Sequence, residues 1–324
     1  MEENTEQRVD LTLFSEKIQE LKDRIASVIV GQEQTVDLVL TAILANGHVL
    51  IEGVPGVAKT LLARLTARLI DADFSRVQFT PDLMPSDVLG TTVFNMKTNG
   101  FDFHQGPIFA DIVLVDEINR APAKTQAALF EVMEERQVSI DGTTHRMGEL
   151  YTILATQNPV EQEGTYKLPE AQLDRFLMKI TMDYPSLEEE VNILERHHTN
   201  AALVKLEDVP PVLTKEELLS LRALMSRVFV DRTLLQYIAL IVQQTRTSKA
   251  VYLGASPRAS VAMLQSSKAY ALLQGRDFVT PEDIKFVAPY VLQHRLILTA
   301  EAEMEGYSPV KVTQRLIDKV EVPK

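Results

Sequence analysis

The stretch Val49–Thr60, VLIEGVPGVAKT, decides the fold of this chain. An apolar strand runs into a glycine-containing loop, and Leu61–Ile70 continues as a helix. This order gathers backbone N–H groups and the positive end of a helix at one point, where Lys59 adds its ammonium. Thr60 can offer its hydroxyl to Mg²⁺ beside the phosphates. The pattern predicts a nucleoside triphosphate site; an ordinary strand–helix turn is the alternative.

One position departs from the phosphate-loop pattern, which has glycine immediately before the lysine. Here that position is Ala58. A methyl group still allows a phosphate to approach the backbone if φ stays negative, and we expect that geometry at Ala58. The departure is therefore interpreted as a variant of the loop and not as its loss.

Composition narrows the class of protein. The chain has 324 residues, no cysteine and a net charge of −12. It has room for two domains, and no apolar run approaches the ~20 residues of a membrane span. The polar start, MEENTEQRVD, resembles neither a secretory signal nor a transit peptide, so we expect a cytoplasmic protein without disulfides. The acidic surface disfavours nucleic acid as a partner.

Hydrophobic periodicity divides the chain into two parts. Helical patterns at residues 11–28 and Glu33–Ala45 precede alternating strands and helices. That alternation is typical of an α/β domain, with a parallel five-stranded sheet between helices, over residues 1–184. The expected strands are Val49–Ile51, Val77–Phe79, Ile112–Val115, Tyr151–Ala155 and Leu177–Thr181.

After Tyr184-Pro185 only helical patterns have comparable strength. A capping box, Ser186 with Glu189, opens a helix that runs to about His198. Further helices are expected from Thr214, over Arg232–Thr245 and Pro257–Leu273, and from Thr280. Residues 185–324 are therefore predicted to form a smaller, all-helical domain.

Polar residues follow two of the buried strands. Asp116 and Glu117 end the strand DIVLVDE, at the edge where open α/β sheets bind ligands. Asp116 would hold Mg²⁺ through water, and Glu117 would polarise an attacking water. Asn158 ends LATQNP and could orient that water from the opposite side; a plain Asn-Pro turn is the alternative.

Two arginines are further candidates. Arg175 lies between apolar neighbours in LDRF, where a surface salt bridge is the ordinary role. Arg258 falls in the first turn of a helix, where a positive charge opposes the helix dipole. We therefore expect Arg258 to serve an anion across a domain cleft.

The ordered segments GVPGVAKT, LVDEINRAP, ATQNP, EAQLDRF and GASPRAS resemble AAA+ ATPases of the MoxR family, in which alanine before the lysine is usual. The resemblance covers the chain from about Leu11 onward. It implies Walker B at Asp116 and Glu117, sensor 1 at Asn158, an arginine finger at Arg175 and sensor 2 at Arg258. It also places Arg120 towards a neighbouring subunit. The implied nucleotide-binding residues are Val30, Gly31, Gly53, Val54, Pro55, Gly56, Val57, Ala58, Lys59, Thr60 and Asp116, with Mg²⁺ held by Thr60 and Asp116.

Two insertions have hairpin patterns. Thr92–Phe94 and Phe101–Phe103 flank the polar tip Lys97–Gly100, and Gln137–Met147 turns at Asp141-Gly142. They resemble the helix-2 insert and the pre-sensor-1 hairpin of the AAA+ branch that includes MoxR. Ordinary surface hairpins are the alternative.

The resemblance implies a hexameric ring that hydrolyses ATP with Mg²⁺, because Arg175 is expected to complete a neighbour's site. It further implies chaperone-like maturation of client proteins, including metal insertion, with a partner that carries a von Willebrand factor A domain. The alternatives are a DNA-remodelling motor and a nucleotide-gated binding module with little turnover.

Overall fold

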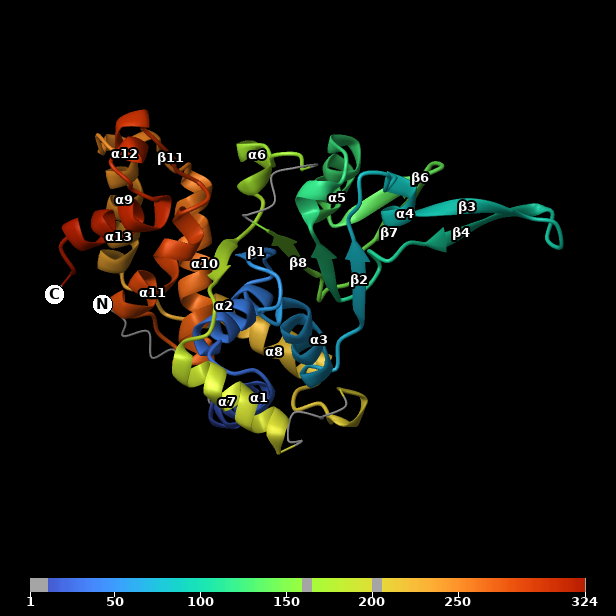
Figure 1. Cartoon of the computed structure of the whole chain (residues 1–324), viewed down its shortest axis with the longest axis horizontal. Coiled ribbons are helices and arrows are strands. Elements are labelled where there is room, and N and C mark those ends of the chain that lie inside the picture. The colour runs from blue at the N-terminus through green and yellow to red at the C-terminus, as the bar shows by residue number, and fades with distance from the viewer. Residues whose placement is uncertain (1–10, 159–164, 200–205, 324) are drawn as a thin grey trace, which may run out of the picture.

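A central parallel sheet organises the protein (Figure 1), whose computed structural model describes residues 11–158, 165–199 and 206–323. The sheet has the order β2-β5-β8-β1-β9, and all neighbouring strands are parallel. The segment 1–10 and Pro159 lie outside the described residues. The five predicted strands are confirmed, although the second begins earlier than expected. Their bounds are β1 Val49–Gly53, β2 Phe74–Gln78, β5 Ile112–Asp116, β8 Thr152–Gln157 and β9 Met178–Met182.

Both faces of the sheet are buried, as the continuous apolar strands predict. In β5, Ile112 and Leu114 join one hydrophobic cluster, whereas Val113 and Val115 join the other. This alternation follows from the two-residue period of a strand. Helices α1 (Thr12–Val28), α2 (Glu33–Leu44) and α3 (Lys59–Leu69) contribute to the first cluster, and α5 (Ala123–Glu135) contributes to the second.

The two predicted hairpins are present. Strands β3 (Gly90–Asn95) and β4 (Gly100–Gln105) follow the short helix α4 (Pro85–Leu89) and project far beyond the body of the molecule (Figure 1). Strands β6 (Gln137–Ile140) and β7 (Thr143–Arg146) form the second hairpin. Phe103 stacks on His145 with ring centroids 4.2 Å apart, so the bases of the two hairpins are in contact.

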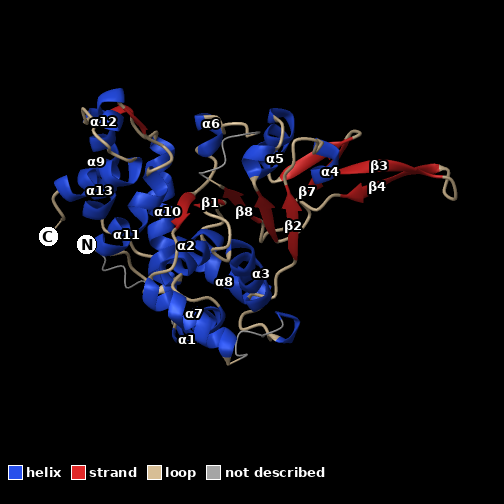
Figure 2. Cartoon of the chain, viewed as in Figure 1, coloured by secondary structure: helices blue, strands red, loops and turns tan. Residues whose placement is uncertain are grey.

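The C-terminal part is mainly helical (Figure 2), as predicted. The expectation of an all-helical domain is wrong in one detail, because β10 (Val251–Leu253) and β11 (Ile297–Leu298) form an antiparallel ribbon. Strands this short leave almost no periodic pattern in the sequence. The helices here are α7 Leu187–His198, α8 Lys215–Leu224, α9 Arg232–Thr247, α10 Pro257–Leu273, α11 Pro281–Leu292, α12 Ala300–Met304 and α13 Pro309–Lys319, after the short α6 Glu170–Leu173.

Helix α8 is held against the α/β layer. Lys215 forms an ion pair of 2.5 Å with buried Asp111, and Arg222 donates to the Ile43 carbonyl. One hydrophobic cluster also continues from α2 into α10. The domain boundary at residue 185 stays a prediction. Within the described part of the chain, no helix combines the length and apolar character needed to cross a membrane.

Candidate functional site

The loop after β1 has the form of a phosphate cradle. Lys59 begins α3 and donates from Nζ to the Gly53 carbonyl over 2.5 Å. Burial lowers the pKa of Lys59, while the negative charges of Asp116 and Glu117 oppose that shift. A Cβ at Gly53 would lie 2.7 Å from the Met182 carbonyl oxygen, so β9 requires glycine there. A Cβ at Gly56 would meet no atom within 4 Å, so the loop opens onto free space that a ligand can occupy.

The expected backbone geometry at Ala58 is wrong. Its φ is +62° and its ψ is +23°, in the left-handed region. This conformation costs an L-residue roughly 1–2 kcal/mol, which explains why glycine is the usual residue at this position. The loop keeps the glycine-type geometry even though alanine replaces glycine, because the strand before it and the helix after it fix both ends.

Asp116 and Glu117 lie at the carboxyl end of β5. The Thr156 hydroxyl donates to Asp116 Oδ1 over 3.1 Å and accepts from the Glu117 amide over 3.0 Å. Glu117 has a φ of +56°, so its side chain leaves the strand at a sharp turn. Thr156 thus connects the two acids, although nothing in the sequence pattern had singled it out.

Cations and an amide surround these acids. Arg76 Nε donates to Asp116 Oδ2 over 2.6 Å, and Gln78 donates to Glu117 Oε2 over 2.7 Å. Arg120 pairs with Glu117 Oε2 at 3.0 Å. The family resemblance places Arg120 towards a neighbouring subunit, whereas here Arg120 contacts an acid of its own chain. Arg76 and Gln78 are two residues apart and therefore lie on the same face of β2. This spacing of two polar residues could have predicted their contacts with the acids.

Strand order brings Asn158 to the same edge. Because β8 lies between β1 and β5, Asn158 lies between the Lys59 loop and the two acids. It is buried, with 9% of its surface exposed. The sequence therefore placed the Walker-type residues at one edge of the sheet, and the structure brings them together there.

Val30 and Gly31 follow the end of α1. Gly31 has a φ of +73°, and a Cβ there would lie 2.4 Å from the Glu189 carboxyl group at the start of α7. Arg196 of α7 donates to the Ser27 carbonyl over 2.6 Å. The segment expected to border adenine is therefore covered by α7, a contact that sequence reasoning did not predict.

Arg175 and Arg258 lie at the opposite edge of the sheet. Both line a cavity of about 600 Å³ that also includes His48, at the amino end of β1. Arg175 donates to the Phe130 carbonyl, and Arg258 forms a loose, exposed ion pair with Glu134 at 3.4 Å. A five-residue strand is roughly 16 Å long, so neither arginine reaches the Lys59 loop of its own chain.

Comparisons with known proteins agree with this geometry. Residues 48–178 match the ATPase family associated with various cellular activities (AAA), and residues 243–318 match the AAA lid domain. The Mycobacterium tuberculosis protein named Chaperone MoxR1 is 45% identical over 93% of this chain and 81% of its own length. The chain belongs to the MoxR family of AAA+ ATPases.

Other members and a solved structure extend the comparison. The uncharacterised protein YeaC of Bacillus subtilis is 48% identical to this MoxR-family chain over 93% of both proteins. A crystal structure from Cytophaga hutchinsonii, described as that of a candidate ATPase, has a TM-score of 0.89 and 41% identity, and covers 97% of each chain. The fold is thus that of a AAA+ domain followed by a AAA lid.

Proposed function

We propose that this protein hydrolyses ATP with Mg²⁺ and uses the energy to remodel or mature client proteins in a chaperone-like way. The observation that carries the proposal is the convergence of Lys59, Asp116–Glu117 and Asn158 at one edge of the sheet. Positioned charges of this kind are what phosphoryl transfer requires, since its catalysis is mainly orientation and charge neutralisation.

The donor set fits a nucleotide-bound magnesium ion. Among the described residues, no group of three or more His, Cys, Asp or Glu could hold a metal by itself. Mg²⁺ typically uses one or two protein oxygens together with phosphates and water, which Thr60 and Asp116 can supply. The ion would neutralise phosphate charge. Lys59 would bind phosphate oxygens, while Glu117 and Asn158 would hold the attacking water.

We infer that Arg175 and Arg258 act on the nucleotide of a neighbouring subunit. Both lie at the amino edge, about a strand length from the Lys59 loop of their own chain. Arginine fingers contribute about 10³–10⁵-fold to rate, so an isolated chain would be nearly inactive. This supports a ring of subunits, and the family resemblance favours a hexamer.

The projecting hairpin β3–β4 is the proposed working surface. Phe101 is 74% exposed and Met96 is 89% exposed, whereas Phe103 is anchored to His145. Exposed apolar residues near a tip favour contact with a client protein or with a von Willebrand factor A domain partner. The name Chaperone MoxR1 supports the chaperone-like role. Metal insertion and a cytoplasmic location remain parts of this proposal.

The alternatives are less well supported. A DNA-remodelling motor would need basic hairpins, yet the first carries only Lys97 and His104 and the second only His145 and Arg146. A binding module with little turnover would not need Glu117, Asn158 and Arg175 together.

Mixing two inactive variants tests the proposal. Lys59→Ala should lose nucleotide binding, and Arg175→Ala should bind nucleotide without hydrolysing it. Together they should regain activity, because some interfaces then join an intact loop to a neighbour's intact Arg175. Native mass spectrometry would verify the mixed assemblies. Verified assemblies without recovered turnover would contradict action between subunits.

A further inference from the structure

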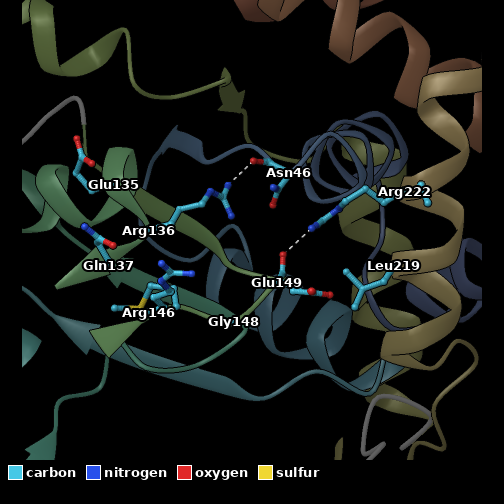
Figure 3. Close-up of a pocket in the computed structure, with 11 residues that line it drawn as sticks. Asn46, Glu135, Arg136, Gln137, Arg146, Gly148, Glu149, Leu219 and Arg222 are labelled. Carbon is cyan, nitrogen blue, oxygen red and sulfur yellow. Dashed lines mark hydrogen bonds between the residues drawn. The ribbon is translucent and has the colours of Figure 1, made fainter. Parts of the chain in front are cut away.

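A basic cavity of about 600 Å³ lies at the amino edge of the sheet, between α8 and the β6–β7 hairpin (Figure 3). Arg136 follows α5, Arg146 ends β7 and Arg222 belongs to α8. Asn46, Glu135 and Glu149 also line the cavity. Two of the arginines thus lie at the base of the β6–β7 hairpin, and α8, far along the sequence, contributes the third.

Two of these arginines bind only neutral oxygens. Arg222 donates to the carbonyls of Glu149 and Ile43, over 2.7 and 2.6 Å. Arg136 donates to the carbonyls of Tyr151 and Asn46, over 3.2 and 2.5 Å. Carbonyls orient a guanidinium but do not neutralise it, and a charge that is partly removed from water without a counter-ion is costly. Arg136 and Arg222 are both partly buried, whereas Arg146 is exposed.

The pKa shifts in the cavity also reflect positive charge without a negative counter-charge. Burial, followed by the positive charge of Arg136, lowers the pKa of Arg222 to about 10, although Glu149 opposes the shift. Burial also lowers the pKa of Arg136. Within the described ranges, no carboxylate lies in ion-pair distance of Arg136, Arg146 or Arg222. Figure 3 shows the Glu135 carboxylate pointing away and the Glu149 side chain running towards Leu219.

Two buried polar atoms of the cavity lack partners in the described structure. Arg222 Nε has no acceptor, and the Asn46 side-chain oxygen has no donor. Buried polar atoms are nearly always hydrogen-bonded, so such a pair needs an explanation. Both atoms have almost no exposed surface, so a ligand that carries anionic oxygens and an O–H group would satisfy them after a small side-chain rotation.

We propose that this cavity binds a phosphate-class anion, with Arg136, Arg146 and Arg222 around its oxygens and Asn46 accepting from its P–O–H group. Guanidinium groups match tetrahedral oxyanions because their planar N–H pairs bind two oxygens together. The anion would join the β6–β7 hairpin to α8 and thereby fix the hairpin. The proposal does not depend on ATP hydrolysis at the opposite edge.

The test measures phosphate binding with the nucleotide loop disabled. Full-length Lys59→Ala protein is titrated with inorganic phosphate by calorimetry, with ionic strength held constant by sodium chloride. Saturable binding is expected. Arg146→Gln in this background should weaken it at least tenfold, and Arg146 is chosen because it makes no side-chain bond within the described structure whose loss would affect folding.

Controls separate the site from general charge effects. Arg232→Gln, which removes an exposed arginine at the start of α9, should bind phosphate like the parent. Arg222→Gln should match Arg146→Gln. Hydrogen exchange over residues 137–147 should slow with phosphate in the parent and remain unchanged in Arg146→Gln. Equal affinities in the parent and Arg146→Gln would overturn the proposal, as would binding that never saturates.

Two further ligands, ADP and malonate, test which chemical group the cavity binds. ADP that competes with phosphate in the Lys59→Ala background would identify the terminal phosphate of a nucleotide as the source, whereas no competition would favour free phosphate. Malonate at the same ionic strength should bind much more weakly. Malonate binding without phosphate binding would show a carboxylate site and overturn the assignment.

Discussion

The two edges of the central sheet carry opposite halves of the candidate chemistry. At the carboxyl edge, an open loop with Lys59 faces the acids Asp116 and Glu117. At the amino edge, arginines such as Arg175 and Arg222 are held by backbone carbonyls. At the first edge the guanidinium groups of Arg76 and Arg120 are paired with these acids, whereas those of Arg175 and Arg222 at the second edge are bonded to neutral carbonyls. Under the proposed function, neither edge of one chain forms a complete site.

The strongest test of this difference is Arg175→Ala. We expect turnover to fall by about 10³–10⁵-fold, because the guanidinium would no longer reach a neighbour's phosphates. Nucleotide affinity should stay unchanged, since the Lys59 loop is untouched. Steady-state ATPase assays and a fluorescent-nucleotide titration would measure the two quantities. Turnover within tenfold of wild type would mean that Arg175, at the amino edge, does not act as an arginine finger.

The carboxyl edge is tested by Glu117→Gln. The substitution preserves shape but removes the carboxylate that would polarise water, so turnover should fall by roughly 10²–10⁴-fold. Nucleotide binding should persist. Gln78→Ala is the matched control, because it removes the 2.7 Å contact to Glu117 while keeping the acid; its loss should be much smaller. Equal losses in the two variants would argue that Glu117 acts only through its position.

The amino edge should be sensitive to acid because of His48. Burial, with the charge of Arg136, lowers the pKa of His48 to about 3, and its Nδ1 accepts from the Ile153 amide. The unfolded chain takes up this proton near pH 6.5, so below that pH unfolding is favoured by up to about 1.4 kcal/mol per pH unit. His48→Gln should flatten the dependence of unfolding free energy on pH between 6.5 and 4.

Urea denaturation at several pH values would measure this slope. His104→Gln, which changes an exposed histidine of β4, should leave the slope unchanged. If His48→Gln and wild type gave parallel curves, another group would be responsible for the loss; His294, also buried with a lowered pKa, is the first to examine.

The smallest expected effect is at Ala58. Ala58→Gly should raise the unfolding free energy by about 0.5–1 kcal/mol, because glycine adopts the φ of +62° without strain. Ala127→Gly, at an exposed position inside α5, should lower it by about 1 kcal/mol. Thermal unfolding of both variants would show the sign. Destabilisation by Ala58→Gly would mean that the left-handed geometry costs the loop little.

Local patterns were enough to predict the sheet, the hairpins and the residues at the carboxyl edge. Each of these features is encoded within a few consecutive residues, as in VLIEGVPGVAKT and DIVLVDE. The φ of Ala58 was mispredicted because the flanking strand and helix override the preference of one residue. The basic cavity was missed for a different reason. Arg136 and Arg146 lie at the base of one predicted hairpin, but only the tertiary fold brings Arg222 of α8 beside them.

The placement of complementary groups on opposite edges restricts the symmetry of any productive assembly. A two-fold dimer pairs each surface with its own copy, so it would join like edges and complete no site. Joining one chain's Arg175 to the next chain's Lys59 is a head-to-tail contact, which either closes into a ring or continues as a filament. The angle between the two edges of a single chain would then set how many subunits close the ring.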